Sequence, residues 1–502
     1  MKKMKTISLS ISLLMLFSLF APVFMVKQVD AQATPIKIGI FAPFTGGGLQ
    51  LYAPWTKQGF ELGMIYATTM MGYDSENMTE AGRPYELHYY DTQSSTTVAS
   101  NLATQAFETD GIDILVGGTS SAVASVLSAK AEEYQKLYFI SPAASSSLTA
   151  EEFNPYVFRI ARNNWQDAYA GVNYAMDTLG YTKFAFLAAD YSFGRFGVDA
   201  MTQAIQDKGG TVVTALYASL AETDFQPTID ALIAADGVND IEYLFVVWAG
   251  NFVYLYNDLF TYNLASYMEL AGACIDIFSM NAIEAGLTPP ATYIGSTGLC
   301  LYGYELPNNT VNDWMVAEHV ARHIKPNGQY GLQYEVPELF TASGFATAQF
   351  LVDATNEVAD LSTNAMINYL ESGITIDCPK GPTYLRPDDH QGLAEMYIAT
   401  AANDTDPASQ TYNLIIAKLN QTLDRNSVAP PIESVWNGEP YVPGGFAPPP
   451  TTTTSGTTTS TGTGTGTGTQ PTGGFDMLTV GVIAIVTLFV GFIVAAVIFR
   501  KK

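Results

Sequence analysis

The sequence has 502 residues, of which 48% are hydrophobic and 12% aromatic, so it holds enough apolar material for more than one buried core. It carries 48 acidic residues against 23 basic ones, a formal net charge of −25. A field of this sign repels phosphate backbones and argues against nucleic acid as a partner. We expect most of the carboxylates to lie on a solvated surface.

The first 33 residues are predicted to be a secretory signal peptide. Three lysines within Met1–Lys5 precede a largely apolar run over Thr6–Val26, and Ala31-Gln32-Ala33 supplies a small-residue cleavage pattern. No cysteine stands at the expected mature N-terminus, so a bacterial-type lipid anchor is not expected. The bulk of the chain is therefore predicted to lie outside the cytoplasm.

The C-terminal end carries a different membrane signal. Met477–Phe499 is uncharged over 23 residues, long enough to cross a bilayer as a helix. Three basic residues over 500–502 then favour the cytoplasmic side of the membrane. Residues 441–475 before it are rich in Pro, Thr and Gly and cannot bury a core, which predicts a stalk. We expect a transmembrane helix over 476–499 that anchors an ectodomain at the cell surface.

Between signal peptide and stalk, short apolar runs alternate with longer amphipathic ones. The predicted strands are Ile36–Phe41, Tyr85–Tyr90, Ile112–Val116, Leu137–Ile140, Phe184–Ala188, Val212–Tyr217, Tyr243–Trp248 and Thr292–Gly295. The predicted helices between them include Thr56–Thr69, Val98–Thr109, Ala122–Tyr134, Trp165–Leu179, Phe196–Lys208 and Phe225–Ala235. This alternation predicts βαβ units and an α/β fold with mainly parallel sheets. Gly and Ser cluster after several strands, where open α/β sheets bind their ligands.

Three cysteines occur, Cys274, Cys300 and Cys378. In an oxidising compartment, two of the three cysteines could form a disulfide and leave one free thiol. Alternatively, all three are simply small buried residues. The sequence does not choose between them, nor does it assign a pair. The spacing suits no zinc site.

A series of short motifs carries a more specific signal. They are A-P-F-T-G at 42–46, G-G-T-S-S at 117–121, I-S-P-A-A-S at 140–145, N-P-Y-V-F-R at 154–159, D-Y-S-F-G at 190–194, T-D-F at 223–225, G-P at 381–382 and R-P-D-D-H-Q at 386–391. In this order they resemble type 1 periplasmic binding proteins, the leucine/isoleucine/valine- and amide-binding receptors of ABC importers. The resemblance extends from about Pro35 to Ser434, most of the expected exported chain.

The resemblance implies two doubly wound, Rossmann-like α/β lobes with the ligand in the cleft between them. It implies three crossings between the lobes, near Phe158, Gly295 and Arg386, about which binding would close the cleft. The implied segments are lobe 1 over 34–157 and 296–386, lobe 2 over 158–295 and 387–440, the stalk over 441–475, the membrane helix over 476–499 and a cytoplasmic tail over 500–502.

The same resemblance implies how a small polar ligand is held. Hydroxyls and backbone N–H groups at helix N-termini satisfy a carboxylate without burying a cation. The implied ligand-binding residues are Tyr52, Ser120, Ser121, Ala143 through its backbone, Ser145, Phe193, Trp248 and Asn251. For any single serine after a strand, helix capping is an equally good explanation.

Two departures from the family pattern leave the ligand open. Phe193 stands where the family has a tyrosine, although Tyr191 is near, and no clear acidic residue follows the next strand to hold an ammonium group. Asp276 is a candidate for holding the ammonium group, and a solvated or helix-capping carboxylate is the alternative explanation for it. Branched-chain amino acids, amides and other organic acids therefore all remain candidate ligands. Arg162 is expected on the surface and Trp165 in a core, with ligand contact as the alternative for both.

The leading hypothesis is a receptor, without cofactor or metal, that delivers a small molecule to an ABC permease and its ATPase as a monomeric ectodomain. The rival is a surface sensor, which would need a partner in trans because only residues 500–502 are cytoplasmic. A surface enzyme is the third class. His319 and His323 are spaced i, i+4, but Val320 replaces the glutamate of a zincin and two exposed histidines explain them better. His88 and His390 complete no catalytic set.

Overall fold

The computed structural model describes residues 33–46, 49–50, 52–73, 77–250, 252–270, 294–322, 336–358, 361–409, 411–412 and 414–444. All of them belong to one compact unit, Met1–Ala447. The predicted signal peptide, most of the stalk and the predicted membrane helix lie outside these residues. Among the described helices, none combines the length and apolarity that crossing a bilayer requires.

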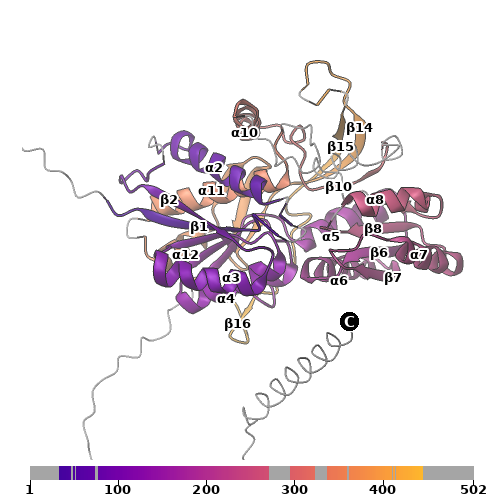
Figure 1. Ribbon diagram of the computed structural model, residues 1–502, viewed down its shortest axis with the longest axis horizontal. Coiled ribbons are helices and arrows are strands. Elements are labelled where there is room, and N and C mark those ends of the chain that lie inside the picture. The colour runs from indigo at the N-terminus through magenta and orange to yellow at the C-terminus, as the bar shows by residue number, and fades with distance from the viewer. Residues whose placement is uncertain are drawn as a thin grey trace, which may run out of the picture. The chain divides into compact units, whose positions relative to one another are not determined.

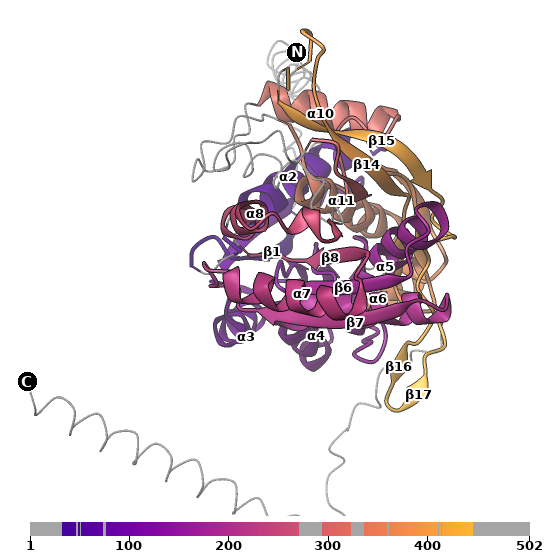
Figure 2. The same cartoon turned by 90° about the vertical axis from the view of Figure 1, so that its right-hand side faces the viewer.

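The larger sheet has eight strands in the order β11-β12-β13-β5-β4-β3-β1-β2. β1 to β5 pair in parallel, β13 pairs in parallel with β5, and β11, β12 and β13 pair antiparallel. Helices α2 and α11 cover one face and α3 and α4 the other (Figures 1 and 2). The bounds are β1 Ile36–Ala42, α2 Ala53–Met70, β2 Tyr85–Asp91, α3 Thr96–Gln105, β3 Ile114–Gly117, α4 Ser121–Tyr134, β4 Leu137–Ile140, β5 Val157–Arg159, α11 Leu339–Glu357, α12 Thr363–Leu370, β11 Thr375–Cys378, β12 Gly381–Arg386 and β13 Gln391–Leu393.

The smaller sheet has four parallel strands in the order β7-β6-β8-β9. Its two faces follow from the period of two in strand side chains. Phe184 and Phe186 of β6 pack with α5 and α6, whereas Ala185 and Leu187 pack on the other side with α7 and α8. The bounds are α5 Asn164–Asn173, β6 Lys183–Ala189, α6 Ser192–Asp207, β7 Thr211–Ala218, α7 Gln226–Asn239, β8 Tyr243–Val247, α8 Phe252–Thr261 and β9 Glu269–Leu270.

A third, antiparallel sheet, in the order β10-β14-β15, lies beside the other two in Figure 1. Its apolar side chains join the cluster that also contains residues of the smaller sheet, α2, α8 and α11, whereas the strands of the larger sheet belong to a separate cluster. The remaining bounds are β10 Thr297–Cys300, α10 Thr310–Ala321, β14 Met396–Asn403, β15 Ile415–Leu423, β16 Val435–Trp436, β17 Glu439–Pro440, the π-helical turns Ala106–Asp110 and Tyr174–Thr178, and the 3₁₀ turns Ser146–Thr149 and Leu264–Ser266.

The first seven predicted strands are confirmed, each within two residues at either end. The eighth, Thr292–Gly295, is wrong where it is described: Ile294 and Gly295 form a turn, and the strand β10 begins at Thr297. Gly295 has a φ of +97°, a conformation that suits glycine in a turn and not a strand. The antiparallel strands β11 to β15 were not predicted.

Helices α2 and α11 pack backbone against backbone. A Cβ on Gly59 would lie 2.1 Å from the carbonyl oxygen of Thr341, and one on Gly63 would lie 2.4 Å from that of Phe345. This close approach fixes the two helices so that their N-terminal ends lie side by side. Tyr52, at the start of α2, stacks there on Phe340, at the start of α11, with ring centroids 4.4 Å apart.

A buried histidine joins the late segment of the chain to β5. The ring of His390 stacks on Phe158, with centroids 4.0 Å apart. Its Nδ1 lies 2.9 Å from the carbonyl oxygen of Val157, and its Nε2 lies 2.9 Å from Oε1 of Glu371. Burial would raise the pKa of Glu371, but hydrogen bonds from His390, Tyr441 and the backbone N–H of Gly444 lower it overall. Through these two contacts His390 links β5 to Glu371, which ends α12.

Gly59→Ala tests the close contact of α2 with α11. The added methyl group meets backbone that cannot move aside, so we expect a loss of about 1–3 kcal/mol in the free energy of unfolding. Gly237→Ala is the matched control, because Gly237 lies within α7 with no atom within 4 Å of the added Cβ. The control should gain about 0.5–1 kcal/mol. Urea unfolding of both variants measures the difference, and equal effects would contradict the backbone contact.

Candidate ligand-binding cavity

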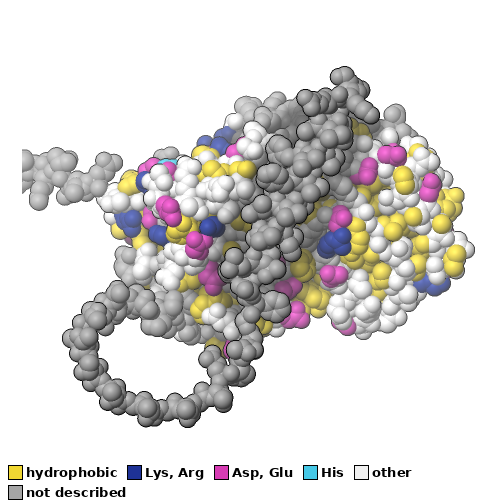
Figure 3. All heavy atoms as spheres, turned by 60° about the horizontal axis from the view of Figure 1, so that its bottom comes forward, with side chains coloured by type: hydrophobic (Ala, Val, Ile, Leu, Met, Phe, Trp, Pro, Cys, Tyr) yellow, Lys and Arg dark blue, Asp and Glu magenta, His cyan; other side chains and the backbone are white. Residues whose placement is uncertain are grey.

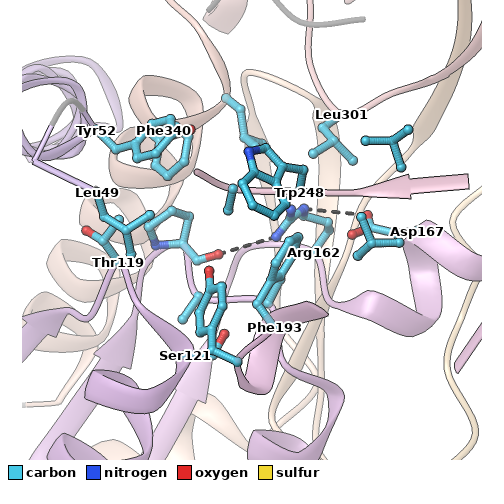
Figure 4. Close-up of a pocket in the computed structure, with 18 of the residues that line it drawn as sticks. Leu49, Tyr52, Thr119, Ser121, Arg162, Asp167, Phe193, Trp248, Leu301 and Phe340 are labelled. Carbon is cyan, nitrogen blue, oxygen red and sulfur yellow. Dashed lines mark hydrogen bonds and ion pairs between the residues drawn. The ribbon is translucent and has the colours of Figure 1, made fainter. Parts of the chain in front are cut away.

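A cavity lies where the carboxyl ends of both parallel sheets meet, which is where open α/β sheets place ligands. The larger sheet and its helices supply one side, chiefly Leu49, Tyr52, Thr119, Ser121, Ala143 and Phe340. The smaller sheet supplies the other, chiefly Tyr191, Phe193, Val247, Trp248 and Phe252. Leu299 and Leu301 close it from the third sheet, and Arg162 and Asp167 come from the segment that follows β5 (Figure 4).

The structure brings five of the eight sequence-predicted residues onto the cavity wall: Tyr52, Ser121, Ala143, Phe193 and Trp248. Ser120 is buried as the N-cap of α4 but does not line the cavity. Ser145 also lies behind the wall, where its hydroxyl pairs with that of Ser147 at 2.9 Å. Asn251 falls outside the described residues, as does Asp276.

Two hydroxyls at the start of α4 face the cavity. Oγ of Ser121, the first residue of the helix, accepts a hydrogen bond from the backbone N–H of Ser145 at 3.2 Å, which leaves its own proton free to donate. Oγ1 of Thr119 is buried and has no hydrogen-bond partner among the described residues. Together with the N-terminus of α4, they form a donor group suited to a carboxylate.

The turn that carries Ala143 is held from behind by a buried arginine. Arg159 donates to the carbonyl oxygen of Ser145 at 2.6 Å, to Oγ1 of Thr149 at 2.5 Å and to Oε1 of Gln391 at 2.7 Å. It has no exposed surface, and burial lowers its pKa to about 9. Arg159 therefore positions the wall of the cavity without lining it.

An ion pair lies in the cavity wall, on the segment that follows β5. The side chain of Arg162 is only 7% exposed, so the expected surface position was wrong. Its Nε lies 3.5 Å from Oδ1 of Asp167, and neither atom has a hydrogen-bond partner among the described residues. A reciprocal cap between Asn163 and Gln166 starts α5 and fixes the position of Asp167. Burial raises the pKa of Asp167, against the nearby charge of Arg162, which lowers it.

Aromatic side chains form the rest of the wall. The stacked rings of Tyr52 and Phe340 stand on one side, and Trp248 stands across from them above Arg162 (Figure 4). The indole N–H of Trp248 is buried and has no acceptor among the described residues. Burial raises the pKa of Tyr191, which therefore stays a neutral hydroxyl. Such walls suit a ligand with an apolar body.

The cavity is small. Its volume of about 100 Å³, taken over the centres of water-sized spheres, compares with roughly 10–15 Å³ for one enclosed water. It therefore has room for a ligand of several heavy atoms, and not for a peptide or an oligosaccharide.

Several wall residues had no usable signal in the sequence. Thr119 lies inside the G-G-T-S-S motif, but the motif favours the two serines beside it as ligand contacts. Asp167 follows the crossover motif by eight residues on a helix, where a solvated carboxylate is the ordinary expectation. Phe340 lies far along the chain from Tyr52, and only the packing of α11 on α2 brings the two together.

The histidines do not assemble a metal or catalytic site among the described residues. His319 is buried, so its expected exposure was wrong, and His323 lies outside the described residues. Nε2 of His88 lies 2.7 Å from Oε1 of Glu86, and His88 does not line the cavity. Over the part of the chain that is described, no three His, Cys, Asp or Glu side chains group so as to hold a metal ion.

Comparison with known proteins identifies the family. The family model described as periplasmic binding protein matches residues 35–406, about three quarters of the chain. A comparison with curated proteins found no match.

Solved structures agree with the family model. An ABC-type branched-chain amino acid transporter protein from Rhodopseudomonas palustris CGA009 is 30% identical, with a TM-score of 0.63, covering 80% of this chain and 100% of its own. An amino acid ABC transporter substrate-binding protein from Pseudomonas fluorescens Pf-5 is 15% identical, with a TM-score of 0.65 and coverage of 80% and 100%. A solute-binding protein from R. palustris in complex with benzoate is 19% identical, with a TM-score of 0.62 and coverage of 78% and 98%. The chain therefore belongs to the periplasmic binding protein family, the extracytoplasmic solute-binding receptors of ABC importers.

Proposed function

We propose that this receptor captures an amino acid with an apolar side chain in the cavity between its two lobes. The observation that carries the proposal is the grouping of three kinds of contact around one small space. Hydroxyl donors lie at the start of α4, a carboxylate with a free oxygen lies on α5, and aromatic rings form the walls. An α-amino acid presents the three matching groups.

The carboxylate of the ligand would bind at Thr119 and Ser121. A buried carboxylate needs dense hydrogen bonds to replace its lost water. The two hydroxyls and the N-terminal end of α4 supply them without a cation directly at that point. The backbone of Ala143, held in place by Arg159 through the neighbouring Ser145, lies next to this group.

The ammonium group would bind at Asp167. Among the described residues, Asp167 is the one carboxylate on the cavity wall, and its Oδ1 has no hydrogen-bond partner. Arg162 faces it at 3.5 Å, too long for a hydrogen bond, so the carboxylate can accept a new donor. Asp167 thus takes the role for which the sequence offered only Asp276.

A second candidate ligand is an aromatic acid that lacks the amino group. The stacked Tyr52 and Phe340 opposite Trp248 favour a flat body, and Arg162 could then meet the charge of the acid. Two solved structures of the same fold, 18–19% identical to this chain, are in complex with 4-hydroxybenzoate and benzoate, so proteins with this fold do bind aromatic acids.

We further propose that binding involves no bond making or breaking, and that the lobes close over the ligand about the segments near Phe158, Gly295 and Arg386. A closed cavity excludes water and strengthens each polar contact within it. The eight predicted site residues, the segment boundaries given above and a monomeric ectodomain stay part of this proposal. So does the anchor, a single C-terminal transmembrane helix that keeps the receptor near its permease.

Leucine and 4-methylpentanoate distinguish the two ligands, because they differ only in the amino group. We expect leucine to raise the melting temperature of the purified full-length protein and 4-methylpentanoate to do so far less. Asp167→Asn should weaken leucine binding by about ten-fold or more and leave 4-methylpentanoate unchanged. Because the pKa of Asp167 is raised, leucine affinity should begin to fall at a pH above the usual carboxyl range as the buffer is acidified.

Asp207→Asn is the control for this experiment. Asp207 is exposed at the end of α6 and bonds only Gln203 among the described residues, so the variant should bind leucine like the wild type. Equal binding of both acids to the wild type would overturn the amino acid proposal and favour the aromatic or simple acid.

The anchor is tested by ending the chain before Met477. The full chain should stay in the membrane fraction after an alkaline wash, because an apolar stretch of 23 residues partitions into the bilayer. The shortened chain should appear in the soluble exported fraction with ligand binding intact. A full chain that is released by the wash would disprove the anchor.

A further inference from the structure

A second, smaller cavity lies beside the first and shares Arg162 and Leu339 with it. It is enclosed by α5, α11 and the turn between β11 and β12, at the junction of the lobes. Its volume of about 30 Å³, on the same measure as before, suits one or two water-sized groups. Its polar side chains are those of Arg162, Gln166, Ser343, Lys380 and Thr383, with two positive charges and no carboxylate.

Lys380 has no anionic partner in this setting. Its Nζ lies 3.4 Å from Sδ of Met396 and over the ring of Tyr397, at 5.5 Å from the centroid. No carboxylate oxygen of the described residues lies within 4.0 Å of it, although the charges of Asp167 and Glu395 act from further away. Burial, followed by the positive charge of Arg162, lowers the pKa of Lys380 to about 8. The ammonium group therefore lacks the counter-charge that burial demands.

Gln166 points a second donor into the same space. Its Oε1 accepts from the backbone N–H of Asn163 at 2.9 Å and from Nε2 of Gln391 at 3.3 Å, which fixes the orientation of the amide. The side chain is buried, with the residue 1% exposed, and Nε2 has no partner among the described residues. A buried N–H₂ group without an acceptor costs free energy that a bound acceptor would recover.

The side chains that line this cavity carry positive charge, whereas the chain as a whole is negatively charged. Acidic residues outnumber basic ones by 48 to 23, and Figure 3 shows acidic side chains scattered over the face that it draws. Two cations and an unpartnered amide nevertheless share a small space into which no carboxylate projects. Such a donor set is suited to an anion.

We propose that the second cavity is an anion-binding site that seats either a free halide or the distal carboxylate of a ligand held in the first cavity. Lys380 supplies the charge, Gln166 an amide donor, and Arg162 links the two cavities. The second source rests on one part of the proposed function, the carboxylate site at Thr119 and Ser121, and replaces the apolar side chain of the ligand with a second carboxylate. Binding of a free halide does not depend on the proposed function.

The test uses the purified full-length protein, its Lys380→Met and Lys380→Gln variants, and Lys418→Met as the control with an exposed lysine. Chloride is titrated against gluconate, which is too bulky for the cavity, at constant ionic strength while the melting temperature is followed. Affinities are then measured for succinate, glutarate and adipate against butyrate, pentanoate and hexanoate, which match them in chain length. Crystals grown in bromide locate the anion.

We expect the wild type and Lys418→Met to be stabilised by chloride, with bromide beside Lys380, and both Lys380 variants to lose the response. If the site serves the ligand, at least one diacid will bind the wild type about ten-fold more tightly than its matched monoacid, and the Lys380 variants will lose that preference. Lys380→Gln keeps the inference testable if the methionine variant does not fold.

The inference is overturned if wild type and Lys380 variants respond alike to chloride and show the same ratio of diacid to monoacid affinity. Leucine binding without any such difference would leave the proposed function standing alone. A chloride response at Lys380 without binding of leucine or of any monoacid would support the anion site and reject the proposed function.

Discussion

The rest of the site depends on two buried arginines, Arg159 and Arg162, which lie three residues apart on the segment that leaves β5. Arg159 meets acceptors on Ser145, Thr149 and Gln391, so its charge is compensated within the protein and it stabilises the turn behind the cavity. Among the described residues, Arg162 has only one long hydrogen bond, to the carbonyl oxygen of Pro142, and its Nε faces Asp167 without bonding it. Because a buried charge is costly unless it is paired, the first arginine stabilises the fold, and the second leaves Oδ1 of Asp167 free to accept a hydrogen bond from a ligand.

The fold gives this place its small size and its largely apolar walls. Alternating side chains on β6 and β8 direct apolar groups to both faces of the smaller sheet, and the tight contact of α2 with α11 stacks Tyr52 on Phe340. Apolar walls of this kind lower the local dielectric constant, which strengthens the few polar contacts that face the cavity. Capture of a solute needs nothing more than such a set of fixed donors and acceptors, and the receptors of ABC importers work by binding.

The parallel core could be predicted from the sequence because its buried strands are short apolar runs, several of them followed by glycine or serine. The antiparallel strands β11 to β15 could not, since β12 begins with Gly381-Pro382 and β15 ends in a polar, largely exposed run. For the site, motif order led to Ser121 and Ala143, which lie shortly after the strands β3 and β4. Phe340 owes its position to the packing of α11 on α2, and Asp167 to the way α5 begins, and no local pattern in the sequence records that these two residues reach the cavity.

The most direct test of this account is a crystal structure of the protein with leucine bound. The account predicts the ligand between the lobes, with its carboxylate within hydrogen-bond distance of the hydroxyls of Thr119 and Ser121, and its ammonium group on Oδ1 of Asp167. Leucine outside this cavity, or inside it with the carboxylate on Arg162 and both hydroxyls unfilled, would contradict it.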